Sequence, residues 1–365
     1  MKPKVVLSGV NVREVGSLTI FRGALATLAR EYGNRYEVIA LVKSRELFDV
    51  PGVTYLEFPH LTRSWLTRLR FEYWSMRAIS ARLRPKLWLS MNDVSPNVFA
   101  ESRAVYCHNA SLFYRSSVSE FLLDWRFGMF TLLYRYLYGI NLRANDHVIV
   151  QQDWMRNSFR SIYGARNVIV AHPAWNGGHP RRESKGEARI GPYRFFYPMY
   201  PRTYKNPELC LEAARILERR GFPEFELWLT FSGETNRYAA HVVKQFADVR
   251  SVRWLGLLPH ERVLALYEEA DCLLYPSKLE SWGLPISEFR AYGKPILVAD
   301  LPYAHETIAG HGLARFFDPD DAAGLADLMA KAAEGERIFT EAPAVAISEP
   351  YAKNWSEMFA MLLPD

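Results

Sequence analysis

The sequence predicts an α/β protein of two Rossmann-like, doubly wound domains. Short runs of β-branched and aliphatic residues alternate with longer segments of helical periodicity, which is typical of parallel sheets covered by helices. This alternation stops at residues 173–192, where proline, glycine and charged residues cluster, and then starts again. The chain has 365 residues, 49% of them hydrophobic, which is enough to build two cores.

Each half of the chain contributes its own series of elements. In the first half we predict strands at residues 4–10, 36–42, 53–58, 87–90, 104–107, 147–151 and 167–171, and helices at 18–30 and 154–162. In the second half we predict strands at 193–197, 226–231, 252–255, 272–275 and 295–298, and helices at 207–219, 238–247, 260–270, 284–291 and 320–333. An amphipathic helix at 351–362 follows.

The domain boundaries follow from this rhythm. We assign residues 1–172 to a first domain, 173–192 to a linker, 193–345 to a second domain and 346–365 to a C-terminal helix that is free to cross back to the first domain. Ligands of doubly wound sheets bind outside the carboxyl ends of the strands. We therefore expect the two domains to face each other across a ligand-binding cleft.

Composition narrows the cellular setting. The net charge of +5 suits phosphate-bearing ligands, an anionic membrane surface or nucleic acid. Cys107, Cys210 and Cys272 stand far apart in apolar runs, which indicates buried thiols in a reducing compartment. The N-terminus lacks a signal-peptide pattern, and the longest apolar stretch, residues 127–140, is too short to span a bilayer. We expect a cytoplasmic protein.

The most informative segment is YPSKLESWGLPISEFRAY at residues 275–292. A predicted strand ends there, a polar loop carries Glu280, and Gly283 and Pro285 open a helix that carries Glu288 near its start. Backbone N–H groups at such a helix start favour an anion, for example a diphosphate. The spacing alone fits equally well an ordinary helix start with acidic residues.

The setting of the two glutamates, P-S-x-x-E-S-W-G-L-P-x-x-E, resembles the E-x7-E motif of retaining GT-B glycosyltransferases, especially family 4 and its members in bacterial polysaccharide assembly. Residues 197–213, 254–277 and 293–300 resemble the surrounding segments of that family, and residues 148–171 resemble the end of its acceptor domain. The resemblance implies a GT-B fold whose first domain binds the acceptor and whose second binds a nucleotide-sugar.

The resemblance also implies roles for single residues. Glu280 contacts the transferred sugar and Glu288 the ribose of the donor. Backbone N–H groups of the intervening residues contact the sugar and the diphosphate; these residues are Ser281, Trp282, Gly283 and Leu284. Trp282 stands where the family more often has phenylalanine.

Two cations near the start of the second domain neutralise the diphosphate in this family. Lys205 fits the lysine position, but Tyr200 stands five residues before it, where the arginine is usual. Arg202 is the nearest alternative, so the second cation stays open. Positive charges there would stabilise the leaving diphosphate without a metal. A solvated basic pair at a helix start is the other interpretation.

In the first domain, Gly16 and Ser17 follow the first strand, at the place where family members have a glycine-rich turn beside the diphosphate. His108 follows the strand at 104–107, where family members often place a histidine that contacts the donor sugar. A structural histidine at a strand end is the alternative. Asn109 is suited to cap the next helix.

We expect neither a cofactor nor a metal. The only DxD-like text is Asp318-Pro-Asp320, and Asp320 or Asp321 is better explained as a helix N-cap. The family mechanism is front-face departure of the diphosphate with retention of configuration. Asp93 and Asp153 remain open as alternative nucleophiles.

Two basic, aromatic-rich stretches, residues 61–85 and 113–143, are typical of helices at an anionic membrane surface. The alternative is that both pack on the sheet. We expect no nucleic acid partner, because no motif of that class is present. The expected acceptor is a glycan on a polyprenyl diphosphate, in lipopolysaccharide or other surface polysaccharide synthesis, with the protein peripheral at the inner face of the cell membrane.

The donor stays open among GDP-mannose, which would make the protein a mannosyltransferase, and UDP- or dTDP-sugars. A catalytically silent partner of another transferase, which binds a nucleotide-sugar without turning it over, is the alternative of a different class.

Overall fold

The computed structural model describes residues 2–12, 15–62, 65–173 and 191–364. The chain divides into two compact units. Unit 1 comprises Met1–Leu112, Leu132–Asn176 and Ile347–Asp365, and unit 2 comprises Phe113–Thr131 and Gly177–Ala346. Each unit is described by itself below.

Unit 1 is built on a parallel sheet in the order β14-β7-β6-β5-β4-β1-β2-β3. The strands are β1 (Lys4–Ser8), β2 (Glu37–Val42), β3 (Val53–Glu57), β4 (Leu87–Ser90), β5 (Ser102–Cys107), β6 (His147–Val150), β7 (Val168–Ala171) and β14 (Tyr351–Ala352). The chain runs outward from β1 through β3 and then returns to the other side of β1 at β4. The strand order therefore reverses between β1 and β4, which is where doubly wound sheets bind ligands.

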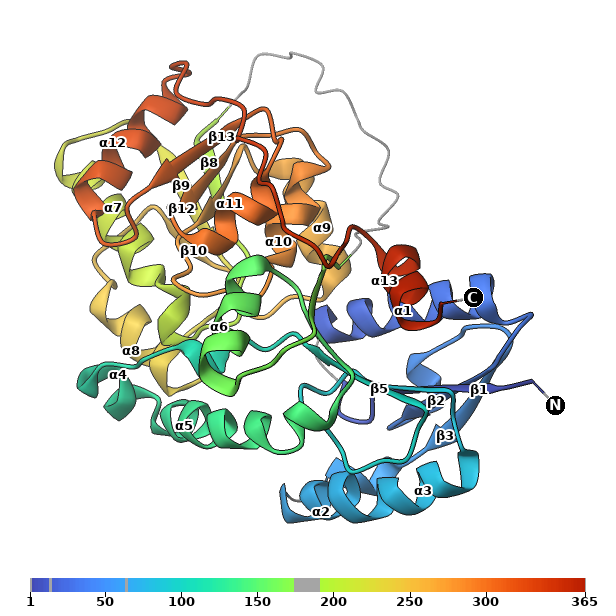
Figure 1. Cartoon of the computed structure of the whole chain (residues 1–365). Coiled ribbons are helices and arrows are strands. Elements are labelled where there is room, and N and C mark those ends of the chain that lie inside the picture. The colour runs from blue at the N-terminus through green and yellow to red at the C-terminus, as the bar shows by residue number, and fades with distance from the viewer. Residues whose placement is uncertain (1, 13–14, 63–64, 174–190, 365) are drawn as a thin grey trace. The chain divides into compact units, whose positions relative to one another are not determined.

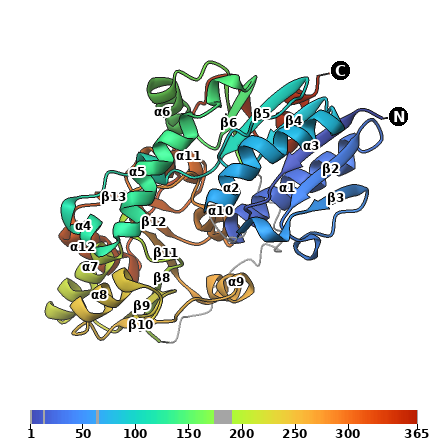
Figure 2. The same ribbon diagram turned by 90° about the horizontal axis from the view of Figure 1, so that it is seen from below.

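Helices cover both faces of this sheet. They are α1 (Val15–Tyr32), α2 (Trp65–Arg70), the π-helical turn η3 (Phe71–Ser75), α3 (Met76–Leu83) and α6 (Asp153–Tyr163), with short 3-10 turns η1 (Arg45–Leu47), η2 (Pro59–Thr62), η4 (Ser111–Phe113) and η5 (Leu142–Ala144). Phe71 and Met76 pack on Val6 and Trp88 of the sheet. Figure 2 shows α2 and α3 running along the strands. Both alternating faces of the strands are buried, as a parallel sheet requires.

The end of the chain belongs to unit 1. β14 pairs in parallel with β7, and α13 (Trp355–Leu362) packs beside α1, as Figure 1 shows. Trp355 approaches Gly23 of α1 so closely that a Cβ atom there would lie 2.9 Å from its indole nitrogen. The fully buried Arg156 of α6 donates to the carbonyl oxygens of Ser348 (2.7 Å) and Pro350 (3.2 Å).

Unit 2 contains a six-stranded parallel sheet in the order β10-β9-β8-β11-β12-β13. Its strands are β8 (Tyr193–Tyr197), β9 (Phe225–Leu229), β10 (Val252–Trp254), β11 (Cys272–Tyr275), β12 (Ile296–Ala299) and β13 (Ala314–Phe317). In chain order this is the 3-2-1-4-5-6 arrangement of a Rossmann sheet, with the reversal between β8 and β11.

The helices of unit 2 follow the strands. They are α4 (Val118–Leu123), the first part of α5 (Trp125–Gly139), the 3-10 turn η6 (Thr203–Lys205), α7 (Pro207–Arg219), α8 (Arg237–Gln245), α9 (His260–Glu269), α10 (Leu284–Arg290), α11 (Pro302–Ile308) and α12 (Ala322–Ala333). α12 and α7 lie side by side (Figure 1).

The predicted fold class is confirmed, since both units are parallel α/β sheets of Rossmann type. Several elements differ from the prediction. α11 and β13 were not expected, and Tyr351–Ala352 form a strand rather than the start of the last helix. Residues 113–131, which the sequence analysis assigns to the first domain, belong to unit 2. The predicted linker lies almost wholly outside the described residues.

Candidate functional site

Two predicted site residues meet at the point where the strand order of unit 2 reverses. Lys205 ends the 3-10 turn η6 that follows β8, and Glu280 lies in the loop that follows β11. Since β8 and β11 are neighbouring parallel strands, both loops start at the carboxyl ends of the strands, on the same side of the sheet. The ammonium group of Lys205 forms an ion pair with Glu280 Oε1. The sheet topology therefore places this pair where a Rossmann domain binds its ligand.

The surroundings of the pair hold it in place. The Tyr275 hydroxyl donates to Glu280 Oε1 over 2.9 Å, so both observed bonds reach the same carboxylate oxygen. Tyr197 donates to the Lys205 carbonyl over 2.8 Å and fixes the turn. Burial raises the pKa of the Tyr275 hydroxyl well above its usual value, and the neighbouring Glu280 charge adds to this, so Tyr275 stays a donor. The Lys205 and Glu280 side chains are 14% and 12% exposed, so they remain accessible at one edge.

The loop from Glu280 to α10 depends on one glycine. Gly283 has φ +86° and ψ +59°, a left-handed conformation that favours glycine, and Pro285 follows in the first turn of α10. Trp282 is buried and donates from its indole to the Ser287 hydroxyl over 2.8 Å. Ser281 and Leu284 flank these residues on the same loop and helix start. Because α10 has only seven residues, the anion site expected at its start stays a prediction.

Glu288 is the fifth residue of α10, near the helix start as predicted, and its side chain is only 7% exposed. Oε1 lies 2.9 Å from His260 Nε2, and Oε2 accepts a hydrogen bond of 2.9 Å from the Tyr267 hydroxyl. The hydrogen bond to Glu288 raises the pKa of His260. Neither His260 nor Tyr267 was predicted from the sequence to lie at the site, although α9, which carries both, ends shortly before the motif in the chain.

Arg202, the open candidate for the second cation, has another partner in this structure. Its guanidinium lies 2.6 Å from Asp124 Oδ2 and stacks over the rings of Phe127 (5.3 Å) and Tyr200 (5.2 Å). Asp124 and Phe127 belong to the α4–α5 segment, which is part of unit 2. The structure therefore brings together Lys205 and Glu280 but directs Arg202 to a separate ion pair.

The remaining predicted residues lie in unit 1. Gly16 and Ser17 form part of the first turn of α1, which begins at Val15, so they do not form the expected turn before the helix. His108 follows β5, and its backbone N–H donates to Asp93 Oδ1 over 2.7 Å. Its ring Nδ1 lies 3.5 Å from the same oxygen. These residues share no unit with Glu280, and their roles stay predictions.

The carboxylates that remained open as nucleophiles have structural partners. Asp93 accepts from the N–H groups of His108 and Asn109, and Asp153 forms an ion pair with Arg156. Asn109 caps the short turn η4 by accepting from the Ser111 N–H over 2.9 Å.

The residues of the DxD-like text have equally local roles. Asp321 caps α12 by accepting from the Gly324 N–H, while Asp320 pairs with Lys278. The N-cap interpretation is therefore confirmed for Asp321.

A polar cluster that was not predicted from the sequence lies where the strand order of unit 1 reverses. Glu72 is buried, accepts from Asn11 Nδ2 over 3.4 Å through Oε1, and has no hydrogen bond at Oε2. Arg68 donates to the Asn92 carbonyl over 3.4 Å. Burial raises the pKa of Glu72 to about 7, although the nearby Arg68 charge opposes the shift. Glu72 is the only acidic residue between positions 61 and 85, which is the signal that could have found it.

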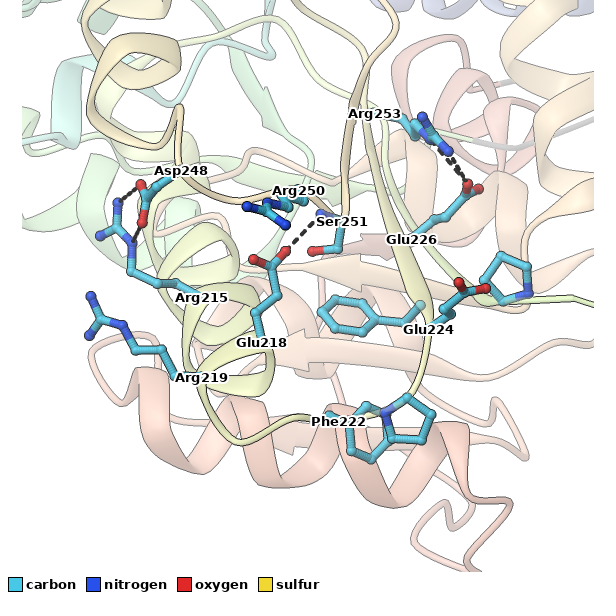
Figure 3. Close-up of a pocket in the computed structure, with 13 residues that line it drawn as sticks. Arg215, Glu218, Arg219, Phe222, Glu224, Glu226, Asp248, Arg250, Ser251 and Arg253 are labelled. Carbon is cyan, nitrogen blue, oxygen red and sulfur yellow. Dashed lines mark hydrogen bonds and ion pairs between the residues drawn. The ribbon is translucent and has the colours of Figure 1, made fainter.

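A surface depression of about 690 Å³ lies elsewhere in unit 2. It is lined by the starts of β9 and β10, at the amino ends of the strands and thus opposite the Lys205–Glu280 pair. Figure 3 shows two of its arginines paired with carboxylates, Arg215 with Asp248 and Arg253 with Glu226. Arg219 and Arg250 line it as well, but it lies at the opposite ends of the strands from the predicted site.

The second half of the chain matches a known family. Residues 182–349 match the family model described as glycosyl transferases group 1, a stretch that contains β8 to β13 and the whole 275–292 motif. This stretch is therefore similar to group 1 glycosyl transferases. The chain is 30% identical over 124 residues to the O-antigen chain mannosyltransferase B of Escherichia coli, which is 34% of this chain and 32% of that protein. It is 29% identical over 108 residues to a glycogen synthase of Mycobacterium tuberculosis. The chain thus spans about a third or less of the length of these curated relatives.

Solved structures of similar fold match almost the whole chain, and not only its second half. A sucrose-phosphate synthase from Thermosynechococcus elongatus has a TM-score of 0.64 at 16% identity, over 91% of this chain and 90% of that one. HepE of Anabaena, solved in complex with UDP-glucose, has a TM-score of 0.61 at 13% identity, over 98% and 94%. These likenesses establish the two-domain GT-B fold.

Proposed function

We propose that this protein is a retaining glycosyltransferase that moves a sugar from a nucleotide-sugar to a glycan acceptor. The observation that supports this most directly is the Lys205–Glu280 pair at the reversal point of the unit 2 sheet, within the stretch similar to group 1 glycosyl transferases. Glu288, eight residues after Glu280 and within α10, supplies a second carboxylate. A lysine, a loop carboxylate and a buried carboxylate suit the diphosphate, the sugar and the ribose of one donor.

The geometry allows each group its role. A lysine ammonium group has three N–H donors, and that of Lys205 lies beside Glu280, where the diphosphate and the sugar of a donor would meet. Glu280 receives Lys205 and Tyr275 at Oε1, while Oε2 takes part in neither bond and is suited to accept from a sugar hydroxyl. Lys205 would then stabilise the charge that develops on the leaving diphosphate, and Glu280 would orient the sugar.

The proposed reaction keeps the anomeric configuration by attack on the face from which the diphosphate leaves. It needs no metal, because side-chain cations carry the charge stabilisation, so chelation with EDTA should leave the rate unchanged. GDP-mannose is the first donor to test, since two of the relatives are O-antigen mannosyltransferases. UDP-glucose is the second, because HepE was solved with it.

The test is nucleoside diphosphate release from GDP-, UDP- and dTDP-sugars, with and without a polyprenyl-diphosphate-linked acceptor. We expect turnover with one donor, and a loss of at least about a hundredfold in kcat/KM for Glu288→Ala, as for two lost hydrogen bonds between a charged group and the ribose. Glu226→Ala, which removes a carboxylate of the same domain far from the motif, is the control. Turnover close to wild type in folded Glu288→Ala would refute the site assignment. Donor binding without turnover in the wild type would favour the silent alternative.

We also propose that the protein works at an anionic membrane surface, as a lipid-linked acceptor would require. α5 carries apolar residues on two faces. One face is buried through Phe127, Tyr134 and Tyr138. The other face carries the exposed residues Trp125, Met129, Leu132, Leu133 and Tyr136 at helical spacing, and α4 exposes Val118 and Leu122; these seven residues are called here the α4–α5 stripe.

The α4–α5 stripe is the better of the two predicted membrane segments. Among the residues of 61–85 whose side chains the structure describes, Phe71, Met76 and the partly buried Ile79 and Leu83 pack into the core of unit 1, and Trp74 is exposed. Exposed apolar stripes of this kind mark interaction sites. Arg126 and Arg135 flank the stripe and match an anionic surface. No helix in the described part of the chain is long and apolar enough to cross a membrane.

Flotation with vesicles tests this proposal. The Leu132 and Leu133 side chains are 54% and 48% exposed, so inserting each contributes about 1 kcal/mol. The double variant Leu132→Gln/Leu133→Gln should therefore weaken partitioning into phosphatidylglycerol vesicles by about thirtyfold, since 1.4 kcal/mol is a factor of ten. Trp74→Gln, on the other stretch, is the matched control and should float like the wild type. Equal loss in both variants, or none in the double variant, would contradict the assignment.

A further inference from the structure

Two donors from one helix hold the carboxylate of Glu288. His260 begins α9, and Tyr267 lies seven residues later, two turns along the same face. His260 Nε2 lies 2.9 Å from Oε1 and the Tyr267 hydroxyl 2.9 Å from Oε2, so each oxygen has one protein partner. Tyr267 is fully buried, and its pKa is raised well above the usual value, first by burial and then by Glu288. It therefore acts only as a donor.

This arrangement leaves a defined acceptor geometry. An ionised carboxylate offers about four lone-pair positions, two on each oxygen. Since one position on each oxygen of Glu288 is taken, one remains on each. A vicinal diol presents two O–H donors side by side, and so it matches two neighbouring acceptor positions. The two bonds from α9 also prevent rotation of the carboxylate, which would otherwise move both positions at once.

We propose that His260 is a positioning residue for recognition of the donor ribose: through Nε2–H it orients Glu288 so that each carboxylate oxygen accepts one hydroxyl of the ribose diol. This inference rests on the proposed function, in which Glu288 contacts the ribose. His260 itself touches no reacting atom.

The electrostatic setting agrees with this role. The hydrogen bond to Glu288 and its charge raise the pKa of His260, Glu261 acts in the same direction, and partial burial opposes them. Both the imidazolium and the neutral tautomer with a proton on Nε2 donate to Glu288, so the contact is retained when His260 loses its charge. The His260 side chain is 30% exposed, whereas the carboxylate that it holds is 7% exposed. The bond therefore acts at the accessible side of an otherwise enclosed carboxylate.

The experiment compares ribonucleotides with analogues that lack the diol. Dissociation constants of GDP and UDP, and of 2′,3′-dideoxy-GDP and 2′,3′-dideoxy-UDP, are measured by calorimetry for the wild type, His260→Ala, His260→Gln and Glu288→Gln. We expect the wild type to prefer the ribonucleotide by about a hundredfold or more, from two hydrogen bonds to a charged group. His260→Ala should reduce this preference to about threefold, through weaker binding of the ribonucleotide alone. His260→Gln, whose amide can donate from the position of Nε2, should restore most of it.

The matched control is His305→Gln, since His305 forms a similar pair with Asp300 (2.6 Å) elsewhere in the same unit. It should keep the wild-type preference. If Glu288→Gln abolishes the preference and folded His260→Ala keeps it, the role of His260 is refuted and the proposed function stands. If Glu288→Gln keeps the preference, the ribose assignment fails together with this inference. Should His260→Ala not fold, a His260→Gln variant with a lost preference overturns the inference and one with a retained preference supports it.

Discussion

The ion pair between Arg202 and Asp124 allows a direct test of which cations bind the donor. If Arg202 binds the diphosphate, it must first leave Asp124. The two side chains are 32% and 14% exposed, so the pair contributes about 1 kcal/mol, the upper end for accessible pairs. Asp124→Asn removes this competing charge and should tighten binding of GDP or UDP by about fivefold, because 1.4 kcal/mol is a factor of ten. In the wild type the Phe127 N–H donates to Asp124 Oδ1 over 3.2 Å, and an asparagine side chain at position 124 can still accept this hydrogen bond.

The assay is calorimetric titration of Asp124→Asn, Arg202→Gln and the double variant with GDP and UDP. Arg202→Gln should weaken binding by at least about tenfold, since hydrogen bonds from charged groups contribute about 1.5–3 kcal/mol. In the double variant the gain from Asp124→Asn should disappear. Glu226→Gln, which releases Arg253 from a comparable pair, is the control and should leave affinity unchanged. Unchanged affinity in both Asp124→Asn and Arg202→Gln would refute the assignment of Arg202 as a diphosphate ligand.

Three further predictions concern stability. Arg156→Met should lower the free energy of unfolding in urea by about 3 kcal/mol or more, since its buried guanidinium holds the Ser348 carbonyl, and a loss below 1 kcal/mol would contradict this. Because the pKa of Glu72 is raised to about 7, its contribution to the free energy of unfolding is fully present below the unfolded pKa near 4.5. This contribution is lost as pH rises through 7. Glu72→Gln should therefore gain about 2–3 kcal/mol relative to the wild type between pH 5 and pH 8, and a pH-independent difference would speak against it. Gly283→Ala should cost about 1–2 kcal/mol from its left-handed backbone and also weaken GDP or UDP binding, whereas Gly310→Ala, at φ +74°, should cost stability alone.

The fold could be predicted from the sequence because its signals are local. Buried strands such as 272–275 are continuous apolar runs, and the gap at 173–192 separates two complete series of elements. β13 and β14 were not predicted because neither is a continuous apolar run. Arg315 is exposed within β13, and β14 has only two residues, which are strand only because β7 offers them an edge.

The candidate site could be predicted only where the motif is local. Glu280, Gly283 and Glu288 lie within nine consecutive residues, and the loop after β11 positions the first two. Partners that come from elsewhere in the chain could not be foreseen. His260 reaches Glu288 only because α9 packs beside α10, and Asp124 reaches Arg202 only because residues 113–131 join unit 2.

The return of the chain to unit 1 has a consequence for synthesis on the ribosome. β7 is complete at residue 171, but the strand that covers its open edge arrives only at Tyr351, after all of unit 2 has been made. Until then unit 1 carries an unpaired parallel edge and an α1 surface around Gly23 without Trp355. If translation ended near codon 346, the released chain would have a complete second domain, whereas the open sheet edge of its first domain would be prone to aggregation.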